Sequence, residues 1–249
     1  MEVKSKYGKI IFSTMAIMMF LWIAFWTSKS VAADYWVREP GLGQLKLAAR
    51  LVPSNSDYQQ FLGRYYLYTI EAMDLAKSEA HFRKATKLNP NEPKLWLQLA
   101  SSLEYQGKFD VAEQFYLRAA NLAPVNPIVA WSAGQFFLRQ EKFDAALTHF
   151  RVVLLGTNSY NRALFETAWK ALGDPNKILK DLIPSNQKTE IAYLNYLSEE
   201  RRFGAAKKVW KRVISHPDSL ELRHAGPYIN QLLVAGMGVR AHETWTELL

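Results

Sequence analysis

Two five-residue stretches of this chain match each other 34 residues apart. Residues 108–112 read Lys-Phe-Asp-Val-Ala, and residues 142–146 read Lys-Phe-Asp-Ala-Ala. The match continues outward in four further pairs, which are Leu103 with Phe137, Ala100 with Gly134, Tyr116 with Phe150, and Ala119 with Val153. A repeat of about 34 residues is typical of a two-helix solenoid, because one helix pair cannot bury its apolar face without neighbours. The repeat therefore predicts an array of helix hairpins.

Proline and asparagine mark where these helices begin and end. Pro53, Pro90 and Pro124 each follow an apolar helical pattern, and Asn126-Pro127 supplies a cap followed by a first-turn proline. No segment shows sustained alternation of apolar and polar residues bounded by hairpin turns. The sequence therefore predicts an all-α protein.

Residue types also recur at fixed places within the repeats, most completely in the stretch 93–124 and in the unit that begins at Pro127. They are Trp96, Leu99, Ala100, Leu103, Ala112, Tyr116, Ala119 and Pro124, then Ala133, Gly134, Phe137, Ala146, Phe150 and Val153. The pattern resembles the tetratricopeptide repeat (TPR) family, whose units place Trp, Leu, Gly and Tyr on a first helix and Ala, Phe, Ala and Pro on a second. The resemblance implies a TPR-like α-solenoid, a right-handed superhelix in which small residues let paired helices approach closely.

The resemblance extends over most of the chain and predicts its organisation. Residues 1–33 would form a cytoplasmic tail with a signal anchor or signal peptide, and residues 34–56 a linker with a half-repeat helix. The array would cover 57–249, in units of about 57–90, 91–124, 125–158, 159–185 (short and degenerate), 186–218 and 219–249. His81 and His149 occupy equivalent places in their units, so we expect both on the outer face.

The segment 10–26 is uncharged and almost wholly apolar. As a helix it would span roughly 26 Å, close to the thickness of a thin hydrocarbon core. Lysines at positions 4, 6 and 9 precede it and only Lys29 follows closely, so the positive-inside rule places the N-terminus in the cytoplasm. For a bacterial protein, the repeats would then lie on the periplasmic side of the inner membrane.

Two interpretations of this segment remain open. The apolar run is longer than the usual signal-peptide core of about 7–15 residues, which favours a retained single-pass signal anchor. Alternatively, Val31-Ala32-Ala33 resembles a small-residue cleavage site, and the segment would be a signal peptide removed before Asp34. Both interpretations place the repeats across the membrane from the cytoplasm.

Composition argues against several classes of function. The chain has no cysteine, and none of its five histidines stands near another ligand at metal-site spacing. Phosphate-loop, nucleophile-elbow and zinc-protease motifs are missing. The formal net charge of +8 falls well short of a nucleic-acid-binding composition. We therefore expect no enzyme, no metal, no cofactor and no nucleic-acid partner.

The resemblance implies a partner-binding groove lined by the first helix of each unit. The residues carried over to it are Gln60, Arg64, Leu67, Lys94, Leu97, Ser101, Trp131, Gln135, Leu138 and Arg139. Apolar anchors between basic side chains suit a peptide with apolar side chains and acidic neighbours. Alternatively, Trp131 is a displaced core residue. The paired Lys and Asn of the family's carboxylate clamp are missing, which disfavours a chaperone-tail receptor.

A second candidate is a basic helix face. Six basic residues lie within a span of twelve, and they are Arg201, Arg202, Lys207, Lys208, Lys211 and Arg212. The last four fall opposite an apolar side made of Ala206, Val209, Trp210 and Val213. This face either contacts anionic lipid or an acidic polymer, or it is a solvated outer surface.

The last predicted helix lacks the polar cap that solenoids need. We expect Ala241, Trp245 and Leu248 to form its packing face. Either further chain or a partner covers this end, or the helix shields itself.

Together these features predict a membrane-tethered, extracytoplasmic scaffold or adaptor. Anchored bacterial proteins of this kind commonly serve envelope, secretion or surface-polysaccharide assembly. Two alternatives are a non-catalytic subunit of a membrane polysaccharide polymerase or glycosyltransferase complex, and a binder of acidic polymer or lipid through the basic face.

Overall fold

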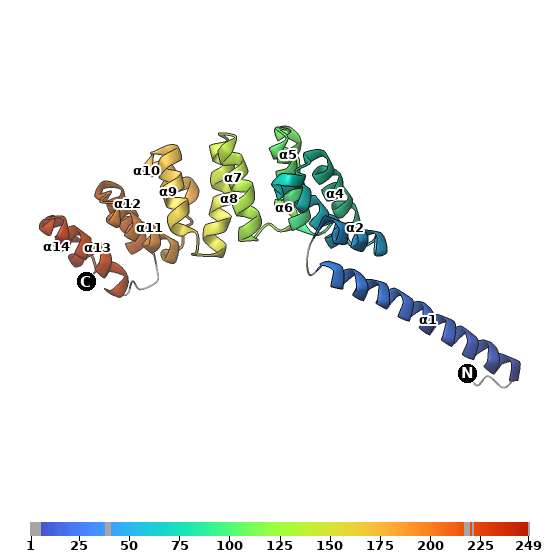
Figure 1. Cartoon of the computed structure of the whole chain (residues 1–249). Helices are drawn as coiled ribbons and strands as arrows, with labels where there is room; N and C mark the ends of the chain where they lie inside the picture. Colours follow the sequence, from blue (N-terminus) through green and yellow to red (C-terminus); the bar gives the residue numbers. More distant parts are fainter. Residues whose placement is uncertain (1–5, 38–40, 217–219, 221, 249) are drawn as a thin grey trace. The chain divides into compact units, whose positions relative to one another are not determined.

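The computed structural model describes residues 6–37, 41–216, 220 and 222–248 (Figure 1). All regular structure in this part of the chain is helical, so the all-α prediction is confirmed. The side chains of the lysines at positions 4, 6 and 9, on which the predicted orientation rests, lie outside the described residues. The α-helices are α1 (Lys6–Val37), α2 (Leu42–Leu51), α3 (Ser56–Tyr68), α4 (Leu75–Leu88), α5 (Pro93–Tyr105), α6 (Phe109–Leu122), α7 (Pro127–Arg139), α8 (Phe143–Gly156), α9 (Asn161–Leu172), α10 (Pro175–Lys177), α11 (Gln187–Glu199), α12 (Phe203–Ile214), α13 (Leu222–Val234) and α14 (Gly238–Thr246).

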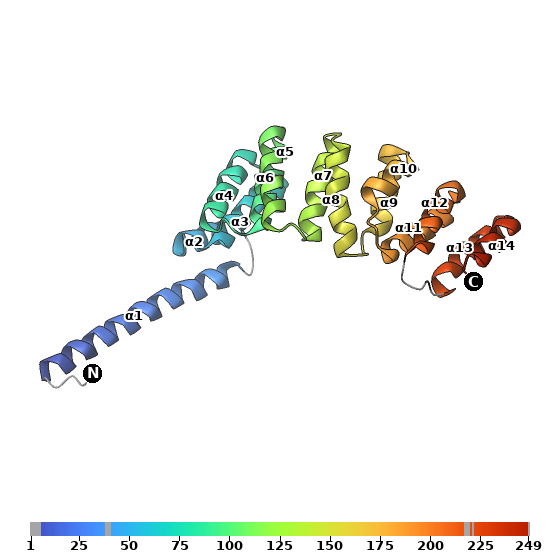
Figure 2. The ribbon, with the colours of Figure 1, turned by 180° about the vertical axis from the view of Figure 1, so that it is seen from behind.

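The chain forms two compact units, Met1–Phe115 and Tyr116–Leu249. In each unit consecutive helices pack as hairpins, such as α3 with α4 in the first and α7 with α8 in the second. Figure 2 shows the same helices from behind. Where the division into repeat units falls stays a prediction.

Glycine lets the two helices of a hairpin approach closely. A Cβ added to Gly134 on α7 would overlap the ring of Phe150 on α8, which is buried. In the first unit, a Cβ on Gly63 would lie 2.7 Å from the Phe82 ring, and the Ser78 hydroxyl donates to the Gly63 carbonyl at 2.9 Å. The small residues of the repeat pattern therefore have a steric cause.

Four hairpin turns share one conformation. Gly107, Glu141, Arg201 and Gly236 have positive φ of 73°, 57°, 56° and 75°, each as the middle residue of a three-residue turn. The next amide donates back to the helix in all four turns, as Lys142 N does to Phe137 O at 2.9 Å. These bonds make a Schellman motif, which satisfies helix-end carbonyls and reverses the chain. The two matching Lys-Phe pairs, 108–109 and 142–143, directly follow two of these residues, Gly107 and Glu141.

The short helix pair of the second unit is irregular. After α9, Gly173 adopts a left-handed φ of 65° and Asp174 caps α10 by accepting from the Asn176 amide at 2.8 Å. The chain then forms a π-helix over Ile178–Leu182, a geometry rare outside single turns. Ile178 and Leu182 are fully buried, so this brief segment fills the place of a full second helix.

Two expectations about side-chain placement are wrong. His81 and His149 do not face outward, because their rings stack on Tyr66 and Phe137 at 5.7 and 5.3 Å between helices of one hairpin. Burial lowers the pKa of both imidazoles. Nearby positive charges lower the pKa of His81 further, whereas burial is the one cause given by the described surroundings of His149. On α14 the buried residues are Ala241 and Thr244, whereas Trp245 is 42% exposed.

One described helix is long and apolar enough to cross a membrane. The candidate span is Ile11–Tyr35, whose most apolar 18-residue window has a mean hydropathy of 1.7 and no buried residue, and an N-terminal signal sequence has the same features. The helix that carries it, α1, continues to Val37, past the expected boundary at residue 33. Its C-terminal end packs against α2.

Candidate functional site

Trp131 lies on the first turns of α7, which Asn126 caps by accepting from the Ile128 amide at 2.9 Å. Its indole stacks on Tyr160 with 4.8 Å between ring centroids, and the Phe150 ring lies 5.9 Å away. The side chain is half-buried. Trp131 is therefore neither a free groove anchor nor a fully buried core residue, and its ring is held in a fixed position.

An open cleft lies beside Tyr160. It has a volume of about 540 Å³ and is formed by the connections before α7 and before α9. Its rim is apolar, with Val125 81% exposed and Ile128 66% exposed. Thr157 and Ser159 place hydroxyls in the lining, 3.2 Å from each other. Exposed branched side chains around a concavity are typical of a surface that receives an apolar group from a partner.

The close approach of two connections shapes this cleft. A Cβ on Gly156 would lie 2.5 Å from Cγ of Pro127, so only glycine fits there without a shift. Sequence reasoning did not find the cleft, because loop residues such as Val125 and Tyr160 lie outside the helical pattern. A pair of exposed branched residues on both sides of Asn126-Pro127 was the available signal.

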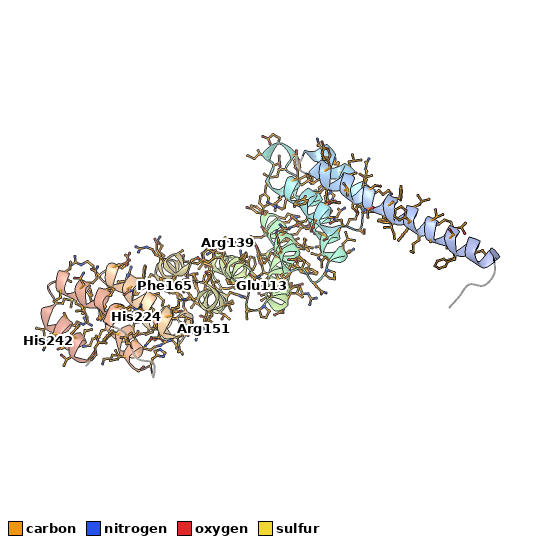
Figure 3. The ribbon with its side chains drawn as sticks, turned by 90° about the horizontal axis from the view of Figure 1, so that it is seen from below. Glu113, Arg139, Arg151, Phe165, His224 and His242 are labelled. Atoms are coloured by element: carbon orange, nitrogen blue, oxygen red, sulfur yellow. The ribbon has the colours of Figure 1, made fainter. Side chains whose placement is uncertain are left out.

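The other candidates of the second unit share one face of α7. Gln135 and Leu138 are half-buried, one and two turns after Trp131, and Arg139 is exposed at the end of the helix (Figure 3). The Arg139 side chain is engaged in an interaction within the chain. The face therefore presents amide and apolar groups with one cation at its end.

The candidates of the first unit lie on α3 and α5. Arg64 and Lys94 are exposed, and Leu97 and Ser101 are half-buried on successive turns of α5. Gln60 and Leu67, also expected in the groove, are only 6% and 4% exposed. They are therefore not accessible lining residues, although Gln60 Nε2 has no hydrogen-bond partner.

Five of the six residues of the basic cluster are exposed, and Arg212 is the exception. As predicted, Ala206, Val209, Trp210 and Val213 are buried on α12. Arg212 also turns inward, where its Nε donates to Glu190 on α11 and its other nitrogens donate to Leu179 O at 2.9 Å and Ile183 O at 3.1 Å. A helical pattern cannot show this, since the partners belong to other elements.

Glu190 is the centre of this network. Its carboxylate is fully buried, and its second oxygen lies 2.7 Å from His216 Nε2. The network joins the segment after α10, the start of α11 and the end of α12. A fully buried carboxylate requires such partners, because its desolvation is costly. Glu190, Arg212 and His216 are therefore structural residues.

The other five basic residues of the cluster differ in what their side chains contact. The Arg202 guanidinium lies 4.0 Å over the Trp169 ring, and Lys208 donates to Asn176 at 2.6 Å. Arg201, Lys207 and Lys211 are exposed, and Arg202 and Lys208 are exposed as well despite these contacts. Arg202 and Trp169 border a cavity of about 320 Å³ together with Tyr196, Glu166, Lys170 and Glu200. Glu166 pairs with Lys170 at 2.7 Å, so the charges of this cavity are largely compensated.

Among the described residues, no three His, Asp or Glu side chains come together in a way that could hold a metal ion. The acidic side chains Glu166 and Glu190 described above are joined to basic side chains in ion pairs. No arrangement of nucleophile, base and orienting group is formed by them.

Sequence comparison identifies the class of protein. The family model described as "Tetratricopeptide repeat" matches residues 70–127 and 97–162. These ranges contain the Gly107 turn and the α7–α8 hairpin with Gly134 and the Asn126 cap, whereas Gly63, Asp174 and Arg201 lie outside them. Residues 70–162 therefore belong to the tetratricopeptide repeat family, as the pattern predicted. Proteins of this family bind other proteins and are typically non-catalytic scaffolds.

No curated protein sequence matches the chain. Among solved structures, PilF of Pseudomonas aeruginosa is 16% identical, with 89% of this chain and 92% of that chain covered and a TM-score of 0.42. PilW, titled a widely conserved type IV pilus biogenesis factor, is 14% identical, with 90% and 91% covered and a TM-score of 0.41. YrrB, titled a TPR protein with an unusual peptide-binding site, is 16% identical, with 67% and 90% covered and a TM-score of 0.34. Similarities this weak carry no argument about function.

Proposed function

We propose that this protein is a membrane-tethered, extracytoplasmic scaffold that holds a partner polypeptide without chemical turnover. The partner would place apolar side chains in the cleft beside Tyr160 and run along the α7 face past Trp131, Gln135 and Leu138. The observation that carries the proposal is the open apolar rim of Val125 and Ile128 next to a fixed aromatic pair. Burying such side chains is worth about 1.5–3 kcal/mol each, enough to anchor a short segment.

The helix α1 supplies the tether in this proposal. It would span the bacterial inner membrane once and leave the repeats on the periplasmic side, where envelope, secretion or surface-polysaccharide assembly takes place. Arg64, Lys94, Leu97 and Ser101 of the first unit would add contacts to a longer partner. No cofactor takes part.

Photo-crosslinking in intact cells tests the proposal. A photoreactive residue at position 128 reports on the cleft, and one at position 148, exposed on α8, is the matched control. We expect a discrete adduct from position 128 alone, lost when Val125 is changed to Asp. Equal adducts from both positions, or none from either, would show that the cleft holds no partner.

The adduct also separates the alternatives. A membrane polymerase or glycosyltransferase in the adduct would make this protein its non-catalytic subunit. Binding of acidic polymer or lipid through the basic helix is the second candidate, supported by the exposed cations Arg201, Lys207 and Lys211. It predicts no adduct from position 128 and strong dependence on salt.

A further inference from the structure

The end of α1 is part of the packed core of the first unit. Ala33 is fully buried in a cluster with Ala48 and Val52 of the α2 region and Tyr58 of α3. Figures 1 and 2 both show α2 beside the C-terminal end of α1. Alanines at 33 and 48 leave little side chain between the helices, as the small residues of the repeat hairpins do.

A hydrogen bond fixes the same end. The Tyr58 hydroxyl donates to Asp34 Oδ1 at 2.6 Å, and the Tyr58 side chain is only 2% exposed. A phenol donating to a carboxylate is a charge-assisted bond, which is shorter and stronger than a neutral one. Residues 33 and 34 are therefore held by two different means, one apolar and one polar.

The length of α1 shows where this docking takes place. With 32 residues, α1 is about 48 Å long, whereas a hydrocarbon core is about 30 Å thick and takes about 20 residues. If the span begins near residue 10, it ends near Lys29, whose ammonium lies 4.5 Å over the Phe25 ring. The docked residues then lie about one turn beyond the hydrocarbon, so α1 itself reaches from the membrane to the packed cluster.

The candidate cleavage site lies inside this docked helix. Residues 31–33 are helical, and the 33–34 peptide bond joins a buried alanine to a carboxylate bonded to Tyr58. A protease needs its substrate bond exposed and locally unfolded. Resting on the tether proposed above, we infer that the N-terminal segment is a retained anchor, and that docking of its last turns on α2 and α3 protects the 33–34 bond from processing.

The inference also explains α2. This helix follows α1 without a complete first helix of its own unit, and the end of α1 packs on it as the partner helix. Cleavage would remove Ala33 from the cluster and uncover Ala48 and Val52. The anchor thereby becomes the first packing element of the array.

The test is the N-terminus of the full-length protein isolated from membranes, read by intact mass and N-terminal sequencing. We expect the wild-type protein to retain residues 1–33. Val52→Asp places a charge in the cluster, and Tyr58→Phe removes only the bond to Asp34. The matched control is Tyr105→Phe, at a tyrosine that is 64% exposed in the same unit.

We expect most Val52→Asp protein to begin at Asp34, a smaller processed fraction for Tyr58→Phe, and none for the control. A wild-type protein beginning at Asp34 would overturn the inference. Variants that all keep residues 1–33 would overturn protection by docking. The adduct from position 128 is independent of this result, since the cleft is present whether or not residues 1–33 remain.

Discussion

Arg212 gives the most demanding quantitative prediction. Replacing it with Met removes the main partner of the fully buried Glu190 carboxylate and the donors to Leu179 O and Ile183 O. Breaking a buried ion pair costs about 3–5 kcal/mol, because it leaves a charge without compensation. His216 still faces Glu190 and the Arg212 side chain is 25% exposed, so we take the lower end, about 3 kcal/mol.

Thermal and urea unfolding of the full chain in detergent, followed by circular dichroism, measures this loss. A destabilisation of about 3 kcal/mol lowers the melting temperature of a chain this size by roughly 6–12 °C. The matched control is Lys211→Met, which removes an exposed cation next in sequence and is expected to change stability by less than about 0.5 kcal/mol.

A double variant tests the cause. If the loss comes from the unpaired Glu190 charge, Glu190→Leu with Arg212→Met recovers much of it, since apolar replacement of a buried ion pair is often neutral. A single Arg212→Met variant within 1 kcal/mol of wild type would refute the reasoning. A double variant no more stable than the single one would place the effect in the lost carbonyl bonds instead.

Three further outcomes follow from single sites. Gly134→Ala should destabilise the α7–α8 hairpin by about 1–3 kcal/mol, measured by urea unfolding, because its Cβ overlaps Phe150. Burial lowers the pKa of His149 in the folded state. The neutral imidazole therefore contributes to the free energy of unfolding above the unfolded pKa of about 6.5, and this contribution is lost as pH falls through the folded pKa. His149→Gln should reduce the fall in melting temperature at acid pH. Burial and the bond to Asp34 raise the pKa of Tyr58 to about 12, so stability should fall between about pH 10 and 12, and absorbance titration against Tyr58→Phe should show the late phenol.

The sequence was sufficient to predict the features that repeat. At the small residues of the repeat pattern, a Cβ on Gly134 would overlap Phe150, and Ala146 is buried. The buried side of α12 is the predicted one. These follow from periodicity, because each helix must turn its apolar side to its neighbours. The family resemblance added the hairpin pairing.

Features that depend on contacts between distant elements could not be predicted. Arg212 belongs to the polar side of its helix by pattern, yet its partners Glu190 and Ile183 lie on other elements. His81 and His149 shared a repeat position, and the correct conclusion was a shared stacking contact rather than shared exposure. The cleft depends on how two loops meet, which no helical period encodes.

Arg212 points inward and is not available to an anionic surface, which bears on the choice between the two candidate functions. Each cation near an anionic surface contributes about 1 kcal/mol, so the five exposed cations of the cluster together supply about 5 kcal/mol, which corresponds to a Kd of roughly a few tenths of a millimolar. Burial of Val125 and Ile128 can supply a similar amount, about 3–6 kcal/mol, and burial does not weaken with salt. We therefore expect Lys207→Glu with Lys211→Glu to leave the adduct from position 128 unchanged, while Val125→Asp removes it. Two results together would move the partner site to the basic helix. The variant with Lys207→Glu and Lys211→Glu would lose the adduct, and the wild-type adduct would weaken as salt is added.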